Sequence, residues 1–168
     1  MADAQNAPRR GLSPDTVYPI VLTRLPDAPA VVVGGGPVGE RKVAGLLAVG
    51  AAVRLISPDA TPQLQAWVEA GRLRWERRGY QTGDLDGAGL VFAAANRREV
   101  NAQVARDAAR LGLLCNVADR PEEGNFFLPA VYRGDDWVIA VSTAGKSPAR
   151  ARRLRDRLAE WLAGQLDL

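Results

Sequence analysis

Three glycines at a regular spacing are the residues of this chain with the clearest chemical meaning. Gly34, Gly36 and Gly39 form a G-x-G-x-x-G pattern between an apolar run, residues 30–33, and a segment with helical apolar spacing. In such a strand-turn-helix unit the first glycine allows a sharp turn, the second lets backbone amides approach a pyrophosphate, and the third lets the helix pack closely on the strand. We therefore expect a dinucleotide here, with its phosphates at the positive end of the helix.

The residues after the second expected strand bear on which dinucleotide is bound. This strand, residues 52–56, runs into Ser57, Pro58 and Asp59. An acidic residue about twenty positions beyond the glycines can hydrogen-bond the ribose of NAD. Asp59 fits that role, and it fits almost equally well as a cap for the helix that starts near Thr61. Since no arginine follows this strand to receive a 2′-phosphate, the sequence favours NAD over NADP.

The composition excludes most other catalytic machinery. The 168 residues include no histidine and one cysteine, which excludes Ser-His-Asp and Cys-His nucleophiles, His-ligated metals and intrachain disulfides. We expect no metal site. Neither Tyr80 nor Tyr132 has a lysine four residues later, the pair used by short-chain dehydrogenases. Any proton must therefore be handled by Asp, Glu, Lys, Tyr or a cofactor.

The segments that must position these residues alternate between strand and helix patterns. We expect strands at residues 30–33, 52–56, 73–77, 90–94 and 113–116. Helices are expected after the glycine turn, from Thr61-Pro62, and after Asn96, which would cap the third. This alternation predicts an α/β fold, a Rossmann-type doubly wound parallel sheet with right-handed crossovers.

The pattern changes beyond Asp119. Residues 130–133 and 137–141 flank a Gly-Asp-Asp turn and predict an antiparallel hairpin. Ser147-Pro148 then predicts the start of a last helix. The apolar residues on one side of this helix are Leu154, Leu158, Trp161 and Leu162. We expect three parts: a disordered leader at 1–16, a dinucleotide-binding domain at 17–116 and a small hairpin-plus-helix segment at 117–168.

Charge and hydropathy indicate the setting of the protein. The chain carries 22 Lys and Arg against 19 Asp and Glu, a mildly basic balance that suits an anionic substrate. No apolar run approaches the ~20 residues of a membrane span, and a signal-peptide core is absent from the first twelve residues. With one cysteine, the expected location is the cytoplasm. We expect no nucleic-acid partner, because no aromatic residues alternate with the arginines of the last helix.

Several blocks of residues resemble a known family. They are residues 18–21 (YPIV), 34–42 (GGGPVGERK), 57–58 (SP), 115–119 (CNVAD), 126–130 (FFLPA) and 142–148 (STAGKSP), followed by arginines between 150 and 155. In this order they resemble the precorrin-2 dehydrogenase and sirohydrochlorin ferrochelatase family, which includes the N-terminal half of siroheme synthase. The resemblance spans about residues 17–157.

The resemblance implies an activity and a set of cofactor contacts. The activity is NAD-dependent oxidation of precorrin-2 to sirohydrochlorin in siroheme or cobalamin biosynthesis, followed in some members by Fe²⁺ insertion. NAD would contact Gly36, Pro37 and Val38 at the glycine turn, Pro58 and Asp59 beside the adenosine ribose, and Ala94, Ala95 and Asn96 near the nicotinamide.

Asp119 matches the catalytic aspartate of that family. It follows the last expected strand of the sheet, where doubly wound folds bind ligands, and a carboxylate is a suitable proton acceptor in a chain without histidine. Judged from the residues alone, an Asx-turn ahead of Arg120-Pro121 is the simpler account of Asp119. Because precorrin-2 is a polycarboxylate, Arg120, Lys146 and Arg150 are candidates to bind its carboxylates.

The resemblance also implies a homodimer built by the hairpin and the last helix. Family members continue into a helical C-terminal domain, whereas this sequence stops at Leu168. We therefore expect a shortened dimerisation and substrate segment, and dehydrogenase activity ahead of ferrochelatase activity. The alternative is a protein of the same fold that binds or senses NAD or a tetrapyrrole without catalysis.

Overall fold

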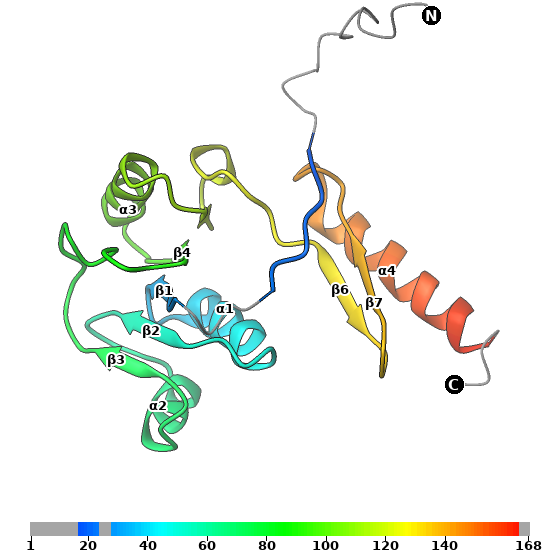
Figure 1. The fold of residues 1–168 in the computed structure, drawn as a ribbon, viewed down its shortest axis with the longest axis horizontal. Coiled ribbons are helices and arrows are strands. Elements are labelled where there is room, and N and C mark those ends of the chain that lie inside the picture. The colour runs from blue at the N-terminus through cyan, green and yellow to red at the C-terminus, as the bar shows by residue number, and fades with distance from the viewer. Residues whose placement is uncertain (1–16, 24–27, 165–168) are drawn as a thin grey trace, which may run out of the picture. The chain divides into compact units, whose positions relative to one another are not determined.

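The structure, a computed structural model, describes residues 17–23 and 28–164. The expected leader at residues 1–16 lies outside this part of the chain. Two compact units are present, one of Leu22–Leu128 and one that joins the described residues of Met1–Val21 to Pro129–Leu168 (Figure 1). In the described parts of the chain, no helix combines the length and apolar character needed to cross a membrane.

The larger unit contains a five-stranded parallel sheet. Its strands are β1 (Ala30–Val33), β2 (Val53–Ile56), β3 (Arg74–Glu76), β4 (Leu90–Ala93) and β5 (Cys115–Val117), in the order β3-β2-β1-β4-β5. The central strand pairs with both neighbours in register, with Ala30 opposite Val53 on one side and Leu90 on the other. The order reverses between β1 and β4, which confirms the expected Rossmann-type doubly wound sheet.

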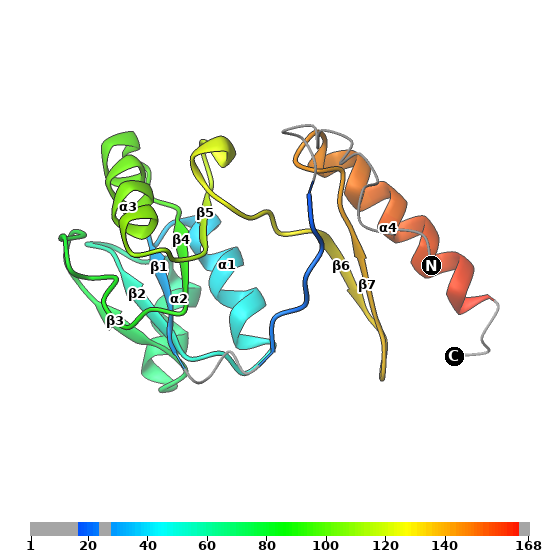
Figure 2. The ribbon, with the colours of Figure 1, turned by 45° about the horizontal axis from the view of Figure 1, so that its top comes forward.

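Helices cover both faces of this sheet. The core on one face contains Val43 and Leu46 of α1 (Pro37–Leu47) and Leu64 of α2 (Pro62–Glu69). The opposite core contains Val104 and Ala108 of α3 (Arg98–Arg110). Figure 2 shows α1 and α3 on opposite sides of the sheet. Successive residues of β1 point into alternate cores, and all four are buried, as a central parallel strand requires.

Two local expectations about α3 and β5 were wrong. Asn96 does not cap α3: the N-cap residue is Arg97, and no side chain makes the capping hydrogen bond. β5 begins at Cys115 rather than at Leu113, because the Leu113 amide donates to Ala108 O at 2.9 Å and still belongs to the turn that ends α3. By contrast, α2 starts at Thr61-Pro62 as expected, and Thr61 rather than Asp59 caps it, with its hydroxyl accepting from the Leu64 amide at 3.3 Å.

The smaller unit is a hairpin covered by one helix. β6 (Ala130–Arg133) pairs antiparallel with β7 (Val138–Val141), and the 16-residue α4 (Pro148–Ala163) packs on the pair. The Ser147 hydroxyl caps α4 by accepting from the Arg150 amide at 3.2 Å. On α4 only Ala151 and Ala159 are buried among the described residues, whereas Leu154, Leu158 and Trp161 are exposed.

Candidate functional site

A cleft of about 630 Å³ lies at the carboxyl ends of the central strands, within the larger unit. Three segments form its walls: the glycine turn after β1, residues 56–61 at the end of β2, and residues 94–97 after β4. Gly79 and Tyr80, after β3, close a further side. Carboxyl ends of parallel strands beside the point where strand order reverses are the ligand-binding edge of doubly wound sheets.

The glycines of the turn have different surroundings, and these separate their roles. Gly34 has φ +116°, which L-residues with side chains rarely adopt, and a Cβ there would lie 2.3 Å from Ala94 O. A Cβ on Gly39 would lie 1.9 Å from Gly34 O, so this glycine lets α1 pack against the turn. A Cβ on Gly36 would meet no protein atom within 4 Å. Gly36 alone among the three therefore leaves space that faces the cleft.

Gly35 is a fourth turn residue that the sequence motif did not single out. Its amide donates to the Ser57 hydroxyl at 2.9 Å, and its carbonyl accepts from the Thr61 amide at 2.9 Å. A Cβ there would lie 2.1 Å from Asp59 O. The turn after β1 and the segment after β2 are thus held together across the floor of the cleft.

The N-terminus of α1 opens into this cleft. Gly36 is the N-cap residue and Pro37 follows it in the first turn of the helix. No side-chain hydrogen bond caps this helix end. The first amides of a helix have no intrahelical partner, and the macrodipole places partial positive charge on them. With Gly36, Pro37 and Val38 all on the cleft wall, this helix end is arranged to receive an anionic group such as a pyrophosphate.

Asp59 lies on the wall of the cleft and is exposed. The competing role as a helix cap is filled by Thr61 instead. Pro58 lines the same wall. A carboxylate at this position, at the end of β2, is available to accept hydrogen bonds from ribose hydroxyls.

The segment after β4 is anchored by a residue that sequence reasoning missed. Asn101 of α3 is 1% exposed. Its Oδ1 accepts from the Ala95 amide at 2.9 Å, and its Nδ2 donates to Ala95 O at 3.0 Å and to Asp119 Oδ1 at 2.9 Å. The spacing of Asn101 from β4 carries no motif, so only the folded chain reveals these contacts. They link the cleft wall to Asp119.

Asp119 follows β5 at the same edge of the sheet, although it is not among the residues that line the cleft. Its side chain is 38% exposed and ion-pairs with Arg98 at 3.2 Å. Arg98 also pairs with Glu123, and the hydrogen bonds from Arg98 to Glu123 and Asp119 raise the pKa of its guanidinium. The carboxylate is thus held by two donors from α3 while part of its surface stays open to a substrate.

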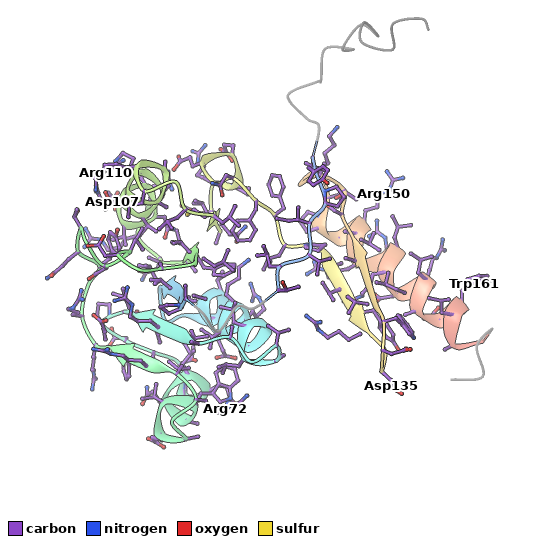
Figure 3. All side chains as sticks on the ribbon, in the orientation of Figure 1. Arg72, Asp107, Arg110, Asp135, Arg150 and Trp161 are labelled. Carbon is purple, nitrogen blue, oxygen red and sulfur yellow. The ribbon has the colours of Figure 1, made fainter. Side chains whose placement is uncertain are left out.

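Tyr80 contributes to the cleft wall from the far side, and its hydroxyl is fixed. The hydroxyl donates to Asp107 Oδ2 at 2.8 Å, and burial together with this bond raises the pKa of Tyr80. Burial would raise the pKa of Asp107, but hydrogen bonds from Gln103 and Tyr80 and the charge of Arg110 outweigh it and lower the pKa. Asp107 and Arg110 lie one turn apart on α3 (Figure 3). Tyr80 was not predicted as a site residue.

The expected cofactor residues converge on one site. Those that line the cleft are Gly34, Gly36, Pro37, Val38, Pro58, Asp59, Ala94, Ala95 and Asn96. Gly39 is buried behind the turn. In the part of the chain that the structure describes, no cluster of three or more His, Cys, Asp or Glu side chains could hold a metal.

The candidate substrate residues fall in both units. Arg120 follows Asp119 in the larger unit and ion-pairs with Glu122 at 3.4 Å. Lys146 and Arg150 belong to the smaller unit, where Lys146 lies in the turn before α4. Arg150 lies in the first turn of α4 (Figure 3). Arg150 also borders a surface hollow of about 570 Å³ along α4.

The doubly wound sheet, the glycine turn and the open helix end together define a dinucleotide-binding protein of the Rossmann class. Comparisons with known proteins agree. Residues 21–130 match the family model "Putative NAD(P)-binding", and residues 139–160 match "Sirohaem biosynthesis protein central". The chain belongs to the precorrin-2 dehydrogenase and sirohydrochlorin ferrochelatase family, as the sequence blocks indicated.

Individual relatives support this assignment. Siroheme synthase 1 of Aeromonas salmonicida (strain A449) is 38% identical over 149 residues, 89% of this chain and 32% of the relative. Siroheme synthase of Pseudomonas entomophila (strain L48) is 39% identical over 145 residues, 86% of this chain and 31% of the relative. The solved structure of "SirC, precorrin-2 dehydrogenase" matches with a TM-score of 0.73 and 30% identity, over 89% of this chain and 71% of that one. The chain spans about a third of the length of the siroheme synthases.

Proposed function

We propose that the protein oxidises precorrin-2 to sirohydrochlorin with NAD⁺ as hydride acceptor, in siroheme or cobalamin biosynthesis. The observation that carries this proposal is the pairing of the nucleotide cleft with Asp119 through the Asn101 side chain. A carboxylate beside a dinucleotide site is what the removal of a hydride and a proton from one substrate requires. The likeness to siroheme synthases and to SirC supports the same chemistry.

The residues of the cleft fit a dinucleotide. The open space at Gly36 accommodates a pyrophosphate close to the backbone, and the free end of α1 supplies amides and partial positive charge. Pro58 and Asp59 would flank the adenosine ribose, and Ala95 and Asn96 the nicotinamide half. When bound, NAD⁺ supplies the hydride acceptor.

NAD rather than NADP is the proposed cofactor. The residue on the cleft wall after β2 is the anionic Asp59, which would accept from ribose hydroxyls and repel a 2′-phosphate. Residues 57–61 contain no arginine or lysine. Arg97, the cation on the cleft wall, follows β4 and ion-pairs with Glu99 at 4.0 Å.

Asp119 is the proposed proton acceptor. Its carboxylate is fixed by Asn101 and Arg98 and remains 38% exposed, so it is oriented and still accessible to a substrate. Arg120, Lys146 and Arg150 are proposed to bind substrate carboxylates, because guanidinium and ammonium groups pair with them. The hydrogen-bonded Asp119 carboxylate also offers an acceptor for pyrrole N–H protons during Fe²⁺ insertion, which we propose as a second activity.

Residues 117–168 are the proposed dimerisation and substrate segment, and residues 17–116 the proposed NAD-binding domain, although the structure groups residues 117–128 with the sheet and residues 17–21 with the hairpin. Leu154, Leu158 and Trp161 leave an apolar stripe along α4 exposed in a single chain, with Trp161 61% exposed. An exposed apolar stripe of this kind favours association with a second surface. A homodimer through this segment is therefore part of the proposal.

The experiment that tests the proposal compares Asp119→Asn with the unchanged chain. Purified protein, precorrin-2 and NAD⁺ are mixed, and NADH formation is followed by absorbance at several NAD⁺ concentrations. We expect turnover by the unchanged chain, loss of roughly a hundredfold or more in kcat for Asp119→Asn, and retained NAD⁺ binding. Asp86→Asn, a substitution at an exposed aspartate in the loop before β4, serves as the matched control.

Two outcomes would contradict the proposal in different ways. Unchanged turnover in Asp119→Asn would remove this residue from proton transfer. NAD⁺ binding without NADH formation in the unchanged chain would favour the alternative, a protein that binds or senses NAD or a tetrapyrrole without catalysis. Preference for NADP⁺ over NAD⁺ in the same titration would contradict the role of Asp59.

A further inference from the structure

The Asn101 side chain contacts two functional segments at once. It arises from the first turn of α3 and is 1% exposed. Its three hydrogen bonds reach both backbone polar groups of Ala95, on the cleft wall, and one oxygen of Asp119, after β5. These segments are more than twenty positions apart in the sequence, yet a single buried amide joins them.

The orientation of this amide is fixed by its partners. The Ala95 N–H requires an acceptor, whereas the Ala95 carbonyl and the Asp119 carboxylate both require donors. One carboxamide satisfies all three with its oxygen and its two N–H bonds, at 2.9 to 3.0 Å. If the amide were turned over, its oxygen would face two acceptors, the Ala95 carbonyl and the Asp119 carboxylate. Its NH₂ group would then face the Ala95 N–H, which is also a donor.

We propose that Asn101 is a positioning residue that couples the nicotinamide side of the cleft to the Asp119 carboxylate. The inference rests on the proposed function, since it assigns Ala95 to the cofactor and Asp119 to proton transfer. Neither partner can move alone without leaving a buried polar atom of Asn101 unpaired, which is unfavourable. The cleft wall and the carboxylate are therefore held in one common geometry.

Arg98 provides a matched comparison within the same helix. It contacts the same carboxylate, at 3.2 Å, and its other side-chain partner is Glu123 rather than a residue of the cleft wall. A substitution at Arg98 therefore disturbs Asp119 without releasing Ala95. A substitution at Asn101 disturbs both.

The test measures NAD⁺ affinity by titration calorimetry on the purified chain and three variants. Asn101→Ala removes all three hydrogen bonds, whereas Asn101→Asp keeps the shape and the acceptor for Ala95 but loses both donors. We expect the NAD⁺ Kd to rise roughly tenfold in both. In Asn101→Ala the cause is the loss of every bond to Ala95, and in Asn101→Asp it is the repulsion of the new carboxylate from the Ala95 carbonyl and from Asp119. Arg98→Gln should leave the Kd within about twofold while lowering kcat with precorrin-2. Circular dichroism verifies that each variant is folded.

A second measurement does not depend on any Asn101 variant being stable. The backbone amide signal of Ala95 is followed in ¹H–¹⁵N spectra of the unchanged chain and of Asp119→Asn. Because Asn101 joins the two residues, we expect the Ala95 signal to shift in Asp119→Asn. The signal of Gly89, an amide outside this network that donates to Pro29 O, should stay in place.

The outcomes separate this inference from the proposed function. Unchanged NAD⁺ affinity in folded Asn101 variants, an equal loss in Arg98→Gln, or an unmoved Ala95 signal in Asp119→Asn would each overturn the coupling. None of these measurements needs precorrin-2 oxidation, apart from the kcat of Arg98→Gln. A chain that binds NAD⁺ and shows the coupling but does not oxidise precorrin-2 would contradict the proposed function alone.

Discussion

The backbone amide of Gly35 donates a 2.9 Å hydrogen bond to the hydroxyl of Ser57, a residue 22 positions away. Ser57 is 8% exposed and directly follows β2. The neighbouring Gly34 amide donates to Ile56 O of β2 at 3.0 Å. Together the two bonds hold the start of the glycine turn against the end of β2 and the residue that follows it. The Ser57 carbonyl accepts in turn from the Trp75 indole at 2.9 Å, which ties the segment to β3.

Removing the Ser57 hydroxyl should loosen the glycine turn. We expect Ser57→Ala to lower the free energy of unfolding by about 1 kcal/mol and to weaken NAD⁺ binding several-fold, measured by denaturant unfolding and by calorimetry. Ser142→Ala is the control, because it removes a hydrogen bond of the same type, from the Ala144 amide to a serine hydroxyl, at an exposed position in the other unit. Equal NAD⁺ affinity in both variants would contradict a role for Ser57 in shaping the turn.

The two glycines at either end of the first turn of α1 should respond differently to a methyl group. Gly36→Ala has no protein atom to clash with, so we expect a stability change within about 0.5 kcal/mol and an NAD⁺ Kd raised at least about tenfold. Gly39→Ala would place its Cβ 1.9 Å from Gly34 O and should cost about 1–3 kcal/mol of stability. Thermal unfolding and NAD⁺ titration together distinguish these effects. Normal NAD⁺ binding by Gly36→Ala would mean that the pyrophosphate does not approach this residue.

A charged cluster beside β3 should make stability depend on pH. Asp84 is 9% exposed and accepts from Arg78 at 2.7 and 2.8 Å and from the Gln81 amide at 2.7 Å. The hydrogen bond from Arg78 holds the pKa of Asp84 below its ordinary value of 3.8. Because the folded state lowers this pKa, the pair stabilises the protein above about pH 4, and the stabilisation is lost as pH falls through the folded pKa.

Asp84→Asn tests this dependence. We expect it to lower the free energy of unfolding at pH 7 by about 1–3 kcal/mol and to reduce the loss of stability between about pH 4 and pH 2. Urea unfolding at several pH values supplies both quantities. Asp86→Asn, two residues along and exposed, should retain the pH dependence of the unchanged chain. An identical pH profile in Asp84→Asn would show that other carboxyl groups control acid unfolding.

The single cysteine should be inert in the folded protein. Cys115 lies in β5 and is 3% exposed, and burial raises the pKa of its thiol to about 11. Since the thiolate is the reactive form, we expect a thiol reagent at pH 8 to label the native chain only at the rate of unfolding. Labelling in denaturant should be immediate. Rapid labelling of the folded chain would place Cys115 outside the core.

Local chemistry in the sequence predicted much of the nucleotide site. The apolar run before Gly34 and the helix after Gly39 fix a strand, a turn and a helix with little reference to the rest of the chain. The strand patterns also placed Asp59 and Asp119 after strands. The hydrogen bonds of Gly35, Tyr80 and Asn101 could not be predicted, because each partner lies on another element and no motif marks the pair.

Misplaced elements show the same limit. Asn96 has the residue type of a helix cap, yet α3 starts two residues later, at Arg98, and leaves Asn96 on the cleft wall. The start of β5 depends on which of its residues pair with β4. The first pair joins Val91 to Cys115, so the strand begins at Cys115. Propensities describe single residues, whereas these boundaries depend on the register between elements.

By itself, the sequence determined the strand-helix alternation, the glycine turn and the absence of histidine chemistry, since these depend on residue types and spacing within one segment. The tertiary structure decided where the amides of Gly34 and Gly35 bond, what holds Asp119 and how the cleft wall connects to it. Those contacts join residues of β4, α3 and β5 that meet only once the parallel sheet has assembled. The chemistry of the proposed site therefore depends on long-range packing, while its location follows from local sequence.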